Sequence, residues 1–215
     1  MIEDRAERVI RDGAVWLRGR LSETEIDQLR SLTSDGDVGK RVSLNEANAA
    51  PLLSALTKEF PTYRAVRLVA FAKTGTQGWT LPWHQDRVIA VKDRAAAEGF
   101  STWSQKSGVW HCEPPISILE RMVFLRVFLD DVGPESGGMS YAIGSHKEGK
   151  VAQSDAANTA KDYSIETEQA DAGDILALPM LTLHRSEKPS IRSPRRVLRV
   201  DLAHCALPPP LEWAA

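Results

Sequence analysis

The sequence is poor in cysteine and has neither a long apolar run nor an excess of basic residues. Its 215 residues include two cysteines, Cys112 and Cys205, too few for a disulfide framework. No apolar run approaches the ~18 residues of a membrane-spanning helix, and no apolar stretch follows a basic region near the N-terminus, as in a secretion signal. The net charge of −2 gives no electrostatic basis for binding nucleic acid or a membrane surface. We therefore expect a cytoplasmic protein that binds neither nucleic acid nor a membrane, with monomer and dimer both open.

The order of the expected elements predicts a mainly β protein with flanking helices. No repeat, low-complexity tract or Gly/Ser linker divides the chain, so we expect one domain over residues 1–215. A capping box of Ser22 and Glu25 begins a first helix, and a second helix is expected over 51–60. From about residue 64 onward, short apolar strands alternate with turn sequences such as GPESGG and DAGD. Helices followed by many strands indicate an α+β fold, with a closed or sandwiched sheet and the helices packed outside it.

One connection between expected strands is unusually long. It runs over 92–119 and is expected to lack regular structure, which is uncommon in a compact domain unless the segment covers a site. Phe100, Trp103 and Trp110 could bury one face of a substrate there, or could simply pin the segment to the body of the protein. The sequence leaves both interpretations open, and the segment is a candidate lid.

A short stretch, LPWHQDRVIA at 81–90, places His84 two positions before Asp86. Side chains at positions i and i+2 of a strand point to the same face, so the imidazole and the carboxylate would share one small volume. Burying a carboxylate is costly unless a partner or a cation lies beside it. The pair is therefore either a structural hydrogen bond or two of the three ligands of a metal ion, and a third ligand decides between them.

His184 is the best candidate for that third ligand. It ends the apolar segment DAGDILALPMLTLH, and Arg195 follows eleven residues later at the start of another strand. Two imidazoles and one carboxylate form the facial triad that binds Fe(II) and leaves its other coordination positions open. An anionic bidentate co-substrate in those positions needs a guanidinium for its far carboxylate.

The remaining histidines are weaker candidates. His111 and His204 are each followed by a cysteine, which suggests a zinc site. Adjacent strand residues point to opposite faces, however, so neither pair would easily bind one ion. His146 lies in the turn-rich stretch GSHKEGK, which we expect to be exposed.

Four segments together resemble the phytanoyl-CoA dioxygenase (PhyH-like) group of Fe(II)/2-oxoglutarate-dependent oxygenases. They occur in the family's order and spacing over about residues 66 to 205, and read FAKTGTQGWTLPWHQDRVIAV, HCEPPISILERMVFLRVFLDD, GGMSYAIGSHKEGK, and GDILALPMLTLHRS with PRRVLRVDLAH. The resemblance implies a double-stranded β-helix (jelly roll) with helices backing one sheet. It also implies a reaction with Fe(II), 2-oxoglutarate and O2 that releases succinate and CO2 and usually hydroxylates a small organic substrate.

The resemblance also assigns roles to individual residues. His84, Asp86 and His184 match the iron ligands, Arg195 matches the anchor for the 2-oxoglutarate carboxylate, and Ser186 matches a helper hydroxyl beside it. Gln85 and Trp103 fall where similar proteins often place active-site contacts. The stretch TGTQGW at 74–79 departs from the more usual asparagine-tryptophan, which leaves a co-substrate role for Gln77 open.

Three alternatives to a hydroxylase can be weighed from the same residues. A jelly-roll binding or regulatory protein without turnover would be favoured by loss of a triad residue, and none is missing. A zinc-dependent hydrolase or isomerase could use the same three ligands, but Arg195 has no obvious purpose there. A halogenating oxygenase needs room for halide at the position that Asp86 fills. The identity of the substrate, free or carrier-linked, stays open.

Strand parity separates two faces of RRVLRVDL. Arg195, Val197, Arg199 and Asp201 share one face, and Arg196, Leu198, Val200 and Leu202 share the other. Parity alone does not show which face is the interior, but the family spacing from His184 puts Arg195 inside. Arg199 and Asp201 would then point inward too, either as a buried ion pair or as contacts to a polar substrate.

Overall fold

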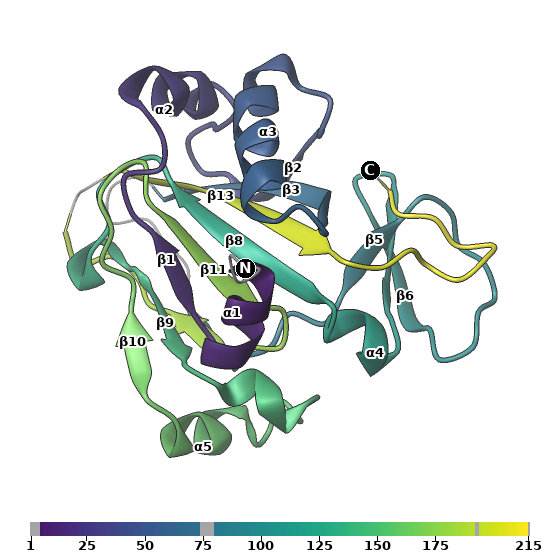
Figure 1. Cartoon of the computed structure of the whole chain (residues 1–215). Coiled ribbons are helices and arrows are strands. Elements are labelled where there is room, and N and C mark those ends of the chain that lie inside the picture. Colours follow the sequence, from purple (N-terminus) through teal and green to yellow (C-terminus); the bar gives the residue numbers. More distant parts are fainter. Residues whose placement is uncertain (1–4, 74–79, 192–193, 215) are drawn as a thin grey trace.

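The largest element of the fold is a six-stranded antiparallel sheet (Figure 1). The computed structural model describes residues 5–73, 80–191 and 194–214. The strand order is β1-β11-β8-β13-β3-β2, with β1 at Val15–Leu17, β11 at Ile175–Pro179, β8 at Met122–Phe128, β13 at Arg195–Ala203, β3 at Arg64–Lys73 and β2 at Val38–Val42. Strands far apart in the sequence thus become neighbours, which brings residues from six segments of the chain into one sheet.

A four-stranded sheet packs against one face of this large sheet. Its order is β10-β9-β12-β4, with β10 at Ile165–Thr167, β9 at Met139–Ala142, β12 at His184–Ser186 and β4 at Leu81–His84. Buried side chains from both sheets form a common apolar core, among them Phe124 and Leu178 from the large sheet and Tyr141 from the small one. Two antiparallel sheets packed in this way form the double-stranded β-helix, so the expected fold class is confirmed.

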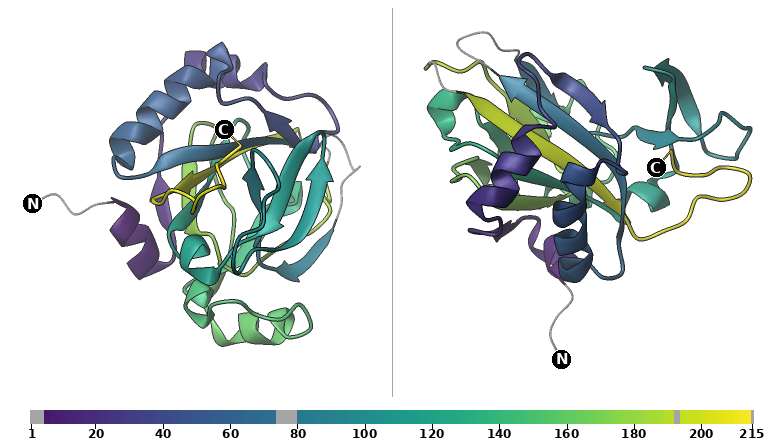
Figure 2. Two further views of the ribbon diagram at one scale, coloured as in Figure 1. Left: turned by 90° about the vertical axis from the view of Figure 1, so that its right-hand side faces the viewer. Right: turned by 90° about the horizontal axis from the view of Figure 1, so that it is seen from above.

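Helices cover the other face of the six-stranded sheet. α1 at Arg5–Asp12, α2 at Glu23–Arg30 and α3 at Ala50–Glu59 pack on it through a second apolar core. Figures 1 and 2 show α2 and α3 together on this side. The remaining helical segments are short: η1 at Ala47–Ala49, α4 at Ile116–Leu119, η2 at Pro134–Ser136, η3 at Ser145–Glu148, α5 at Ala156–Thr159 and η4 at Ala160–Asp162. None of the helices in the described ranges is long and apolar enough to cross a membrane.

The capping box of α2 is present as expected. The Ser22 backbone N–H donates to the Glu25 carboxylate at 2.8 Å, and the Glu25 N–H donates back to the Ser22 hydroxyl at 3.4 Å. These bonds satisfy backbone donors that the first helical turn leaves without partners.

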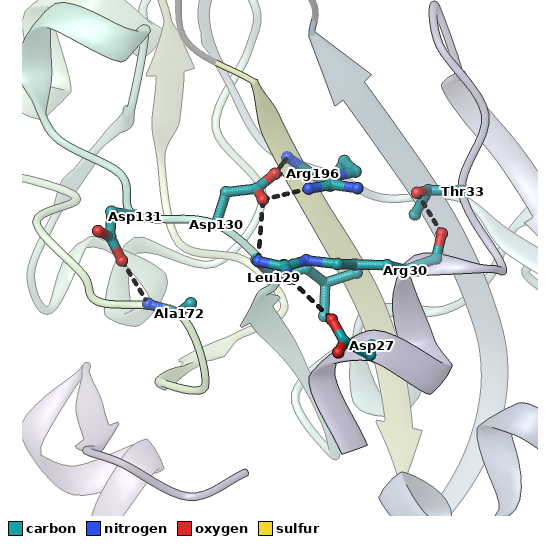
Figure 3. A network of polar contacts seen from close by, with 8 residues as sticks. All are labelled: Asp27, Arg30, Thr33, Leu129, Asp130, Asp131, Ala172 and Arg196. Atoms are coloured by element: carbon teal, nitrogen blue, oxygen red, sulfur yellow. Dashed lines mark hydrogen bonds and ion pairs between the residues drawn. The ribbon is translucent and has the colours of Figure 1, made fainter. Parts of the chain in front are cut away.

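The faces of β13 confirm the prediction from strand parity. Leu198, Val200 and Leu202 lie in the core beneath the helices. Arg196 points to the same side, where its guanidinium donates to Asp130 at 2.5 and 2.8 Å (Figure 3). Arg30 of α2 contacts the same Asp130 carboxylate at 3.3 Å, so Asp130 connects α2 with Arg196 of the sheet. The opposite face, which carries Arg195, therefore lines the interior.

The expectation of an irregular connection over 92–119 was wrong. The segment contains β6 at Ser101–Lys106 and β7 at Val109–Glu113, which pair with β5 at Ile89–Val91 as a three-stranded sheet at one end of the molecule (Figure 1). Lys106 pairs with Val109 across a two-residue turn, in which Ser107 and Gly108 have positive φ values of 49° and 78°. Two such residues in succession form the tight turn that suits a hairpin. Phe100, Trp103 and Trp110 are partly buried against the inter-sheet core, as the pinning interpretation expects.

Candidate metal centre and co-substrate cavity

Three side chains that the sequence separates by up to one hundred positions meet at one end of the small sheet. His84 ends β4, Asp86 follows it, and His184 begins β12 directly opposite His84 in the strand register. The two imidazole centroids are 4.3 Å apart, and His184 Nε2 lies 3.4 Å from Asp86 Oδ2. One potential ligand atom from each residue lies within 4.8 Å of the others, the only such group of His, Cys, Asp and Glu in the described ranges. This donor set matches the 2-His-1-carboxylate triad that binds Fe(II).

Backbone contacts fix the orientation of both imidazoles. His84 Nδ1 lies 2.8 Å from the Pro82 carbonyl oxygen, and His184 Nδ1 lies 2.9 Å from the Thr182 carbonyl oxygen. A carbonyl only accepts, so each Nδ1 must carry the proton, which leaves Nε2 with a free lone pair. Burial and the neighbouring His184 also lower the pKa of His84, which favours the neutral form that a metal requires.

Arg199 holds the carboxylate of the triad. Its Nη1 donates to Asp86 Oδ2, and its Nε donates to Asp201 Oδ1 at 2.6 Å. Burial alone would raise the pKa of Asp86, but Arg199 and the two imidazoles hold it well below its ordinary value. Arg199 and Asp201 thus form the inward-facing ion pair, one of the two arrangements that strand parity left open.

Arg195 is a buried cation whose hydrogen-bonding capacity is only partly used. Its side chain is 4% exposed, and Nε and Nη1 have no hydrogen-bond partner. The nearest carboxylate, Glu168, is 3.7 Å from Nη1, but it accepts from both Arg126 and the Met139 backbone N–H. Burial, together with the nearby Arg126 charge, lowers the pKa of Arg195 to about 10. A buried guanidinium with free N–H groups is a binding site for an anion.

A cavity of about 670 Å³ connects the triad with this arginine. Its size lies within the ~300–1,000 Å³ of typical small-molecule sites. The triad, Arg195 and Ser186 all line it, as expected from the resemblance. Ser186 is buried on β12, two residues after His184.

Gln85 and Trp103, expected to contact the active site, do not line the cavity. The Gln85 amide donates to the carbonyl oxygens of Gly149 and Leu181, both at 2.8 Å, and accepts from the Val151 N–H at 2.9 Å. Its polar groups therefore tie loops together, and it does not line the cavity. Trp103 packs against the inter-sheet core away from the cavity lining, with the Arg94 guanidinium 5.8 Å from its ring centroid. Gln77 lies outside the described residues.

The other histidines do not join the triad. His204 stacks on Tyr63 with ring centroids 5.2 Å apart, and His146 Nε2 contacts the Ile10 carbonyl at 2.9 Å. His111 lines the cavity apart from the triad, with Nδ1 3.0 Å from the Val109 carbonyl. The adjacent Cys112 is buried, which raises its pKa to about 11 and keeps the thiol protonated. These contacts leave no zinc cluster at the two His-Cys pairs among the described residues.

Several charged residues in and around the cavity were not predicted from the sequence. Arg126 and Glu168 form a buried ion pair between positions 42 apart in the chain. Arg41 of β2 and Arg67 of β3 line the same cavity. A lone arginine inside the apolar strand MVFLRVF was the available signal for Arg126, since a buried charge is rare without a partner.

Comparisons with known proteins agree with this geometry. A family model described as phytanoyl-CoA dioxygenase (PhyH) matches residues 9–197. The fold is similar to AviO1 from Streptomyces viridochromogenes Tue57, with 19% identity, 97% of this chain and 98% of that chain covered, and a TM-score of 0.60. HygX from Streptomyces hygroscopicus, with nickel and 2-oxoglutarate bound, gives 18% identity, 94% and 86% coverage and a TM-score of 0.62. EctD from S. alaskensis with bound Fe has 17% identity and a TM-score of 0.66, with 94% of this chain and 76% of that chain covered. No curated protein sequence matches the chain.

Proposed function

The chain belongs to the phytanoyl-CoA dioxygenase (PhyH) family, and from this premise we propose that it is an Fe(II)- and 2-oxoglutarate-dependent oxygenase that hydroxylates a small organic molecule. The observation that carries the proposal is the pairing of the His-Asp-His cluster with an incompletely bonded, buried arginine in one cavity. A zinc hydrolase would need the first feature and not the second.

His84, Asp86 and His184 would hold the metal on one face. The imidazoles present Nε2, and Asp86 supplies the negative charge that a dication needs. Bound Fe(II) would supply the centre at which 2-oxoglutarate and O2 react to give succinate and CO2, one oxygen atom going to the substrate C–H bond. Arg199 keeps Asp86 ionised and oriented, so it acts on the site through that ligand.

Arg195 would bind the far carboxylate of 2-oxoglutarate. Its Nε and Nη1 have no hydrogen-bond partner, so the guanidinium has N–H donors left for a carboxylate, and burial strengthens such charge-assisted bonds. Ser186 lines the same cavity with a hydroxyl that can donate to the same group. The Arg126–Glu168 pair fills the space behind Arg195 and leaves these donors unused.

The proposal is tested by measuring succinate formed from 2-oxoglutarate with Fe(II) and O2, across a metabolite library. We expect binding of Fe(II) and 2-oxoglutarate, slow uncoupled succinate formation, and acceleration by the true substrate. His184→Ala should abolish all three, whereas His204→Ala, which alters a histidine stacked on Tyr63, should preserve them. A wild-type protein that binds neither Fe(II) nor 2-oxoglutarate would overturn the proposal.

A further inference from the structure

We propose that the end of the cavity formed by β2 and the β6–β7 hairpin is a second anion-binding subsite, centred on Arg41, which recognises a carboxylate or phosphate group of the primary substrate. The inference rests on the proposed function, because it assigns a substrate class to the same cavity. It concerns residues that have no part in holding the metal or 2-oxoglutarate.

Strand register places Arg41 in a row of cations along the inner face of the large sheet. Arg41 on β2 pairs with Val69 on β3, and Val69 pairs in turn with Arg199 on β13. Arg199 pairs with Arg126 on β8. Directly paired residues of neighbouring strands project from the same face, so three guanidiniums share one wall. The cavity lining contains all three.

The arginines of this wall differ in their counter-charges. Arg126 is paired with Glu168, Arg199 contacts Asp86 and Asp201, and Arg67 contacts Asp201 at 2.6 Å. Arg41 forms no ion pair with any carboxylate of the described residues. Its Nη1 is buried without a hydrogen-bond partner, and its Nη2 has one long contact of 3.4 Å to the Ala214 carbonyl.

The hairpin adds a positive charge to the cavity that Arg41 lines. Lys106 and Ser107 at its tip line the same cavity, and so does His111 of β7. Burial lowers the pKa of His111, and the positive charges of Arg67 and Arg41 act in the same direction. A neutral His111 can form hydrogen bonds at this end without adding another positive charge.

The lining of the cavity has few acidic residues. Among the described residues that line it, Asp86 is the sole acidic one, against six arginines and two lysines. Asp86 is committed to the metal in the proposed function. Arg41 is half-buried, and its buried Nη1 without a partner is unfavourable, so a ligand carboxylate or phosphate would relieve it with a charge-assisted hydrogen bond.

The strand register separates the backbone positions of Arg41 and Arg195 in both directions of the sheet. On β3, their partners are Val69 and Lys73, four residues apart, which is about 13 Å along the strand. Two strand spacings, about 10 Å, separate β2 from β13 across the sheet. In the proposed function 2-oxoglutarate is held between the triad and Arg195, so an anion at Arg41 belongs to another molecule.

The test uses matched compounds that differ in one charge. Carboxylic acids are compared with their primary amides, and phosphate monoesters with their parent alcohols, by calorimetry on protein loaded with Ni(II) and 2-oxoglutarate. We expect wild type to bind the anionic member of a matched pair about 10- to 100-fold more tightly, the range for hydrogen bonds to charged groups. Arg41→Gln should remove this preference, and Arg41→Lys should retain part of it. The two compound series show which anion is preferred.

Arg8→Gln is the matched control, since it removes one exposed positive charge from α1, outside the cavity lining. It should leave the preference unchanged. Equal binding of anionic and neutral compounds by wild type, or a preference that survives Arg41→Gln, would overturn the inference. If either result occurs while Ni(II) and 2-oxoglutarate still bind normally, the proposed function is unaffected. A protein that binds neither Ni(II) nor 2-oxoglutarate would overturn the proposed function itself.

Discussion

His84 and His184 are direct cross-strand partners on β4 and β12, and the ladder between these strands brings their imidazole centroids to 4.3 Å. The candidate metal centre is therefore assembled by sheet pairing. The Nδ1 of each ring lies within hydrogen-bond distance of the carbonyl oxygen two residues earlier in the chain. Such a preformed site needs little reorganisation on metal binding.

Removing the one anionic ligand should release the metal. Asp86→Ala is expected to lower Fe(II) affinity by more than the roughly 10- to 100-fold that loss of an outer-shell partner costs, and to abolish turnover. Metal content after dialysis measures this. His111→Ala and His204→Ala should keep their iron. Iron lost from the His111 variant but retained in His84→Ala would place the metal elsewhere.

Two adjacent arginines should differ sharply in their effect on co-substrate binding. Arg195→Gln is expected to weaken 2-oxoglutarate binding by about 1.5–3 kcal/mol, or roughly 10- to 100-fold, because it removes a charged donor. Arg196→Gln should change it little, since that side chain bonds Asp130 on the outer face (Figure 3). Titration of 2-oxoglutarate into the Fe(II)-loaded variants without O2 gives both constants. A larger effect at Arg196 would contradict the assignment of Arg195 as the co-substrate anchor.

Local patterns separated the two faces of β13 and suggested the His84–Asp86 pair, and the family resemblance supplied the choice of the inward face and the match to the iron ligands. The alternation along RRVLRVDL follows from strand geometry, whereas β4 ends at His84, so Asp86 lies just beyond the strand that its spacing predicted. Gln85 lies between the two ligands and turns its amide to Gly149 and Leu181. The family resemblance suggested an active-site contact for Gln85, but its amide bonds these two loop carbonyls instead.

Contacts between distant segments could not be predicted in this way. The stretch VGKRV lacks an alternating apolar pattern, so its role as edge strand β2, and with it the position of Arg41, depends on pairing with β3. Glu168 becomes the partner of Arg126 only because the two sheets pack together. The expected active-site contact of Trp103 was wrong, because the Ser-Gly turn makes its segment a hairpin.

The buried pair behind the co-substrate site should be important for stability. Glu168→Gln leaves Arg126 and Arg195 without their shared carboxylate, so we expect a loss of about 3–5 kcal/mol in the free energy of unfolding. Denaturant unfolding measures it. The double variant Arg126→Met/Glu168→Leu, which removes both charges of the pair, should be more stable than the single variant. A Glu168→Gln protein as stable as wild type would show that the pair is not effectively desolvated.

The tip of the β6–β7 hairpin should become ordered when the cavity fills. Lys106 and Ser107 line the cavity, whereas Phe100, Trp103 and Trp110 already pack on the core. We therefore expect slower hydrogen exchange around Lys106 to Gly108 once Ni(II), 2-oxoglutarate and an anionic ligand are bound, and little change near Trp103. Exchange followed by mass spectrometry resolves the two regions. Lys106→Gln should reduce the added protection, because the ligand loses a charged contact at the tip. Equal protection of the tip in free and fully loaded protein would mean that the hairpin is a fixed wall of the cavity and does not act as a lid.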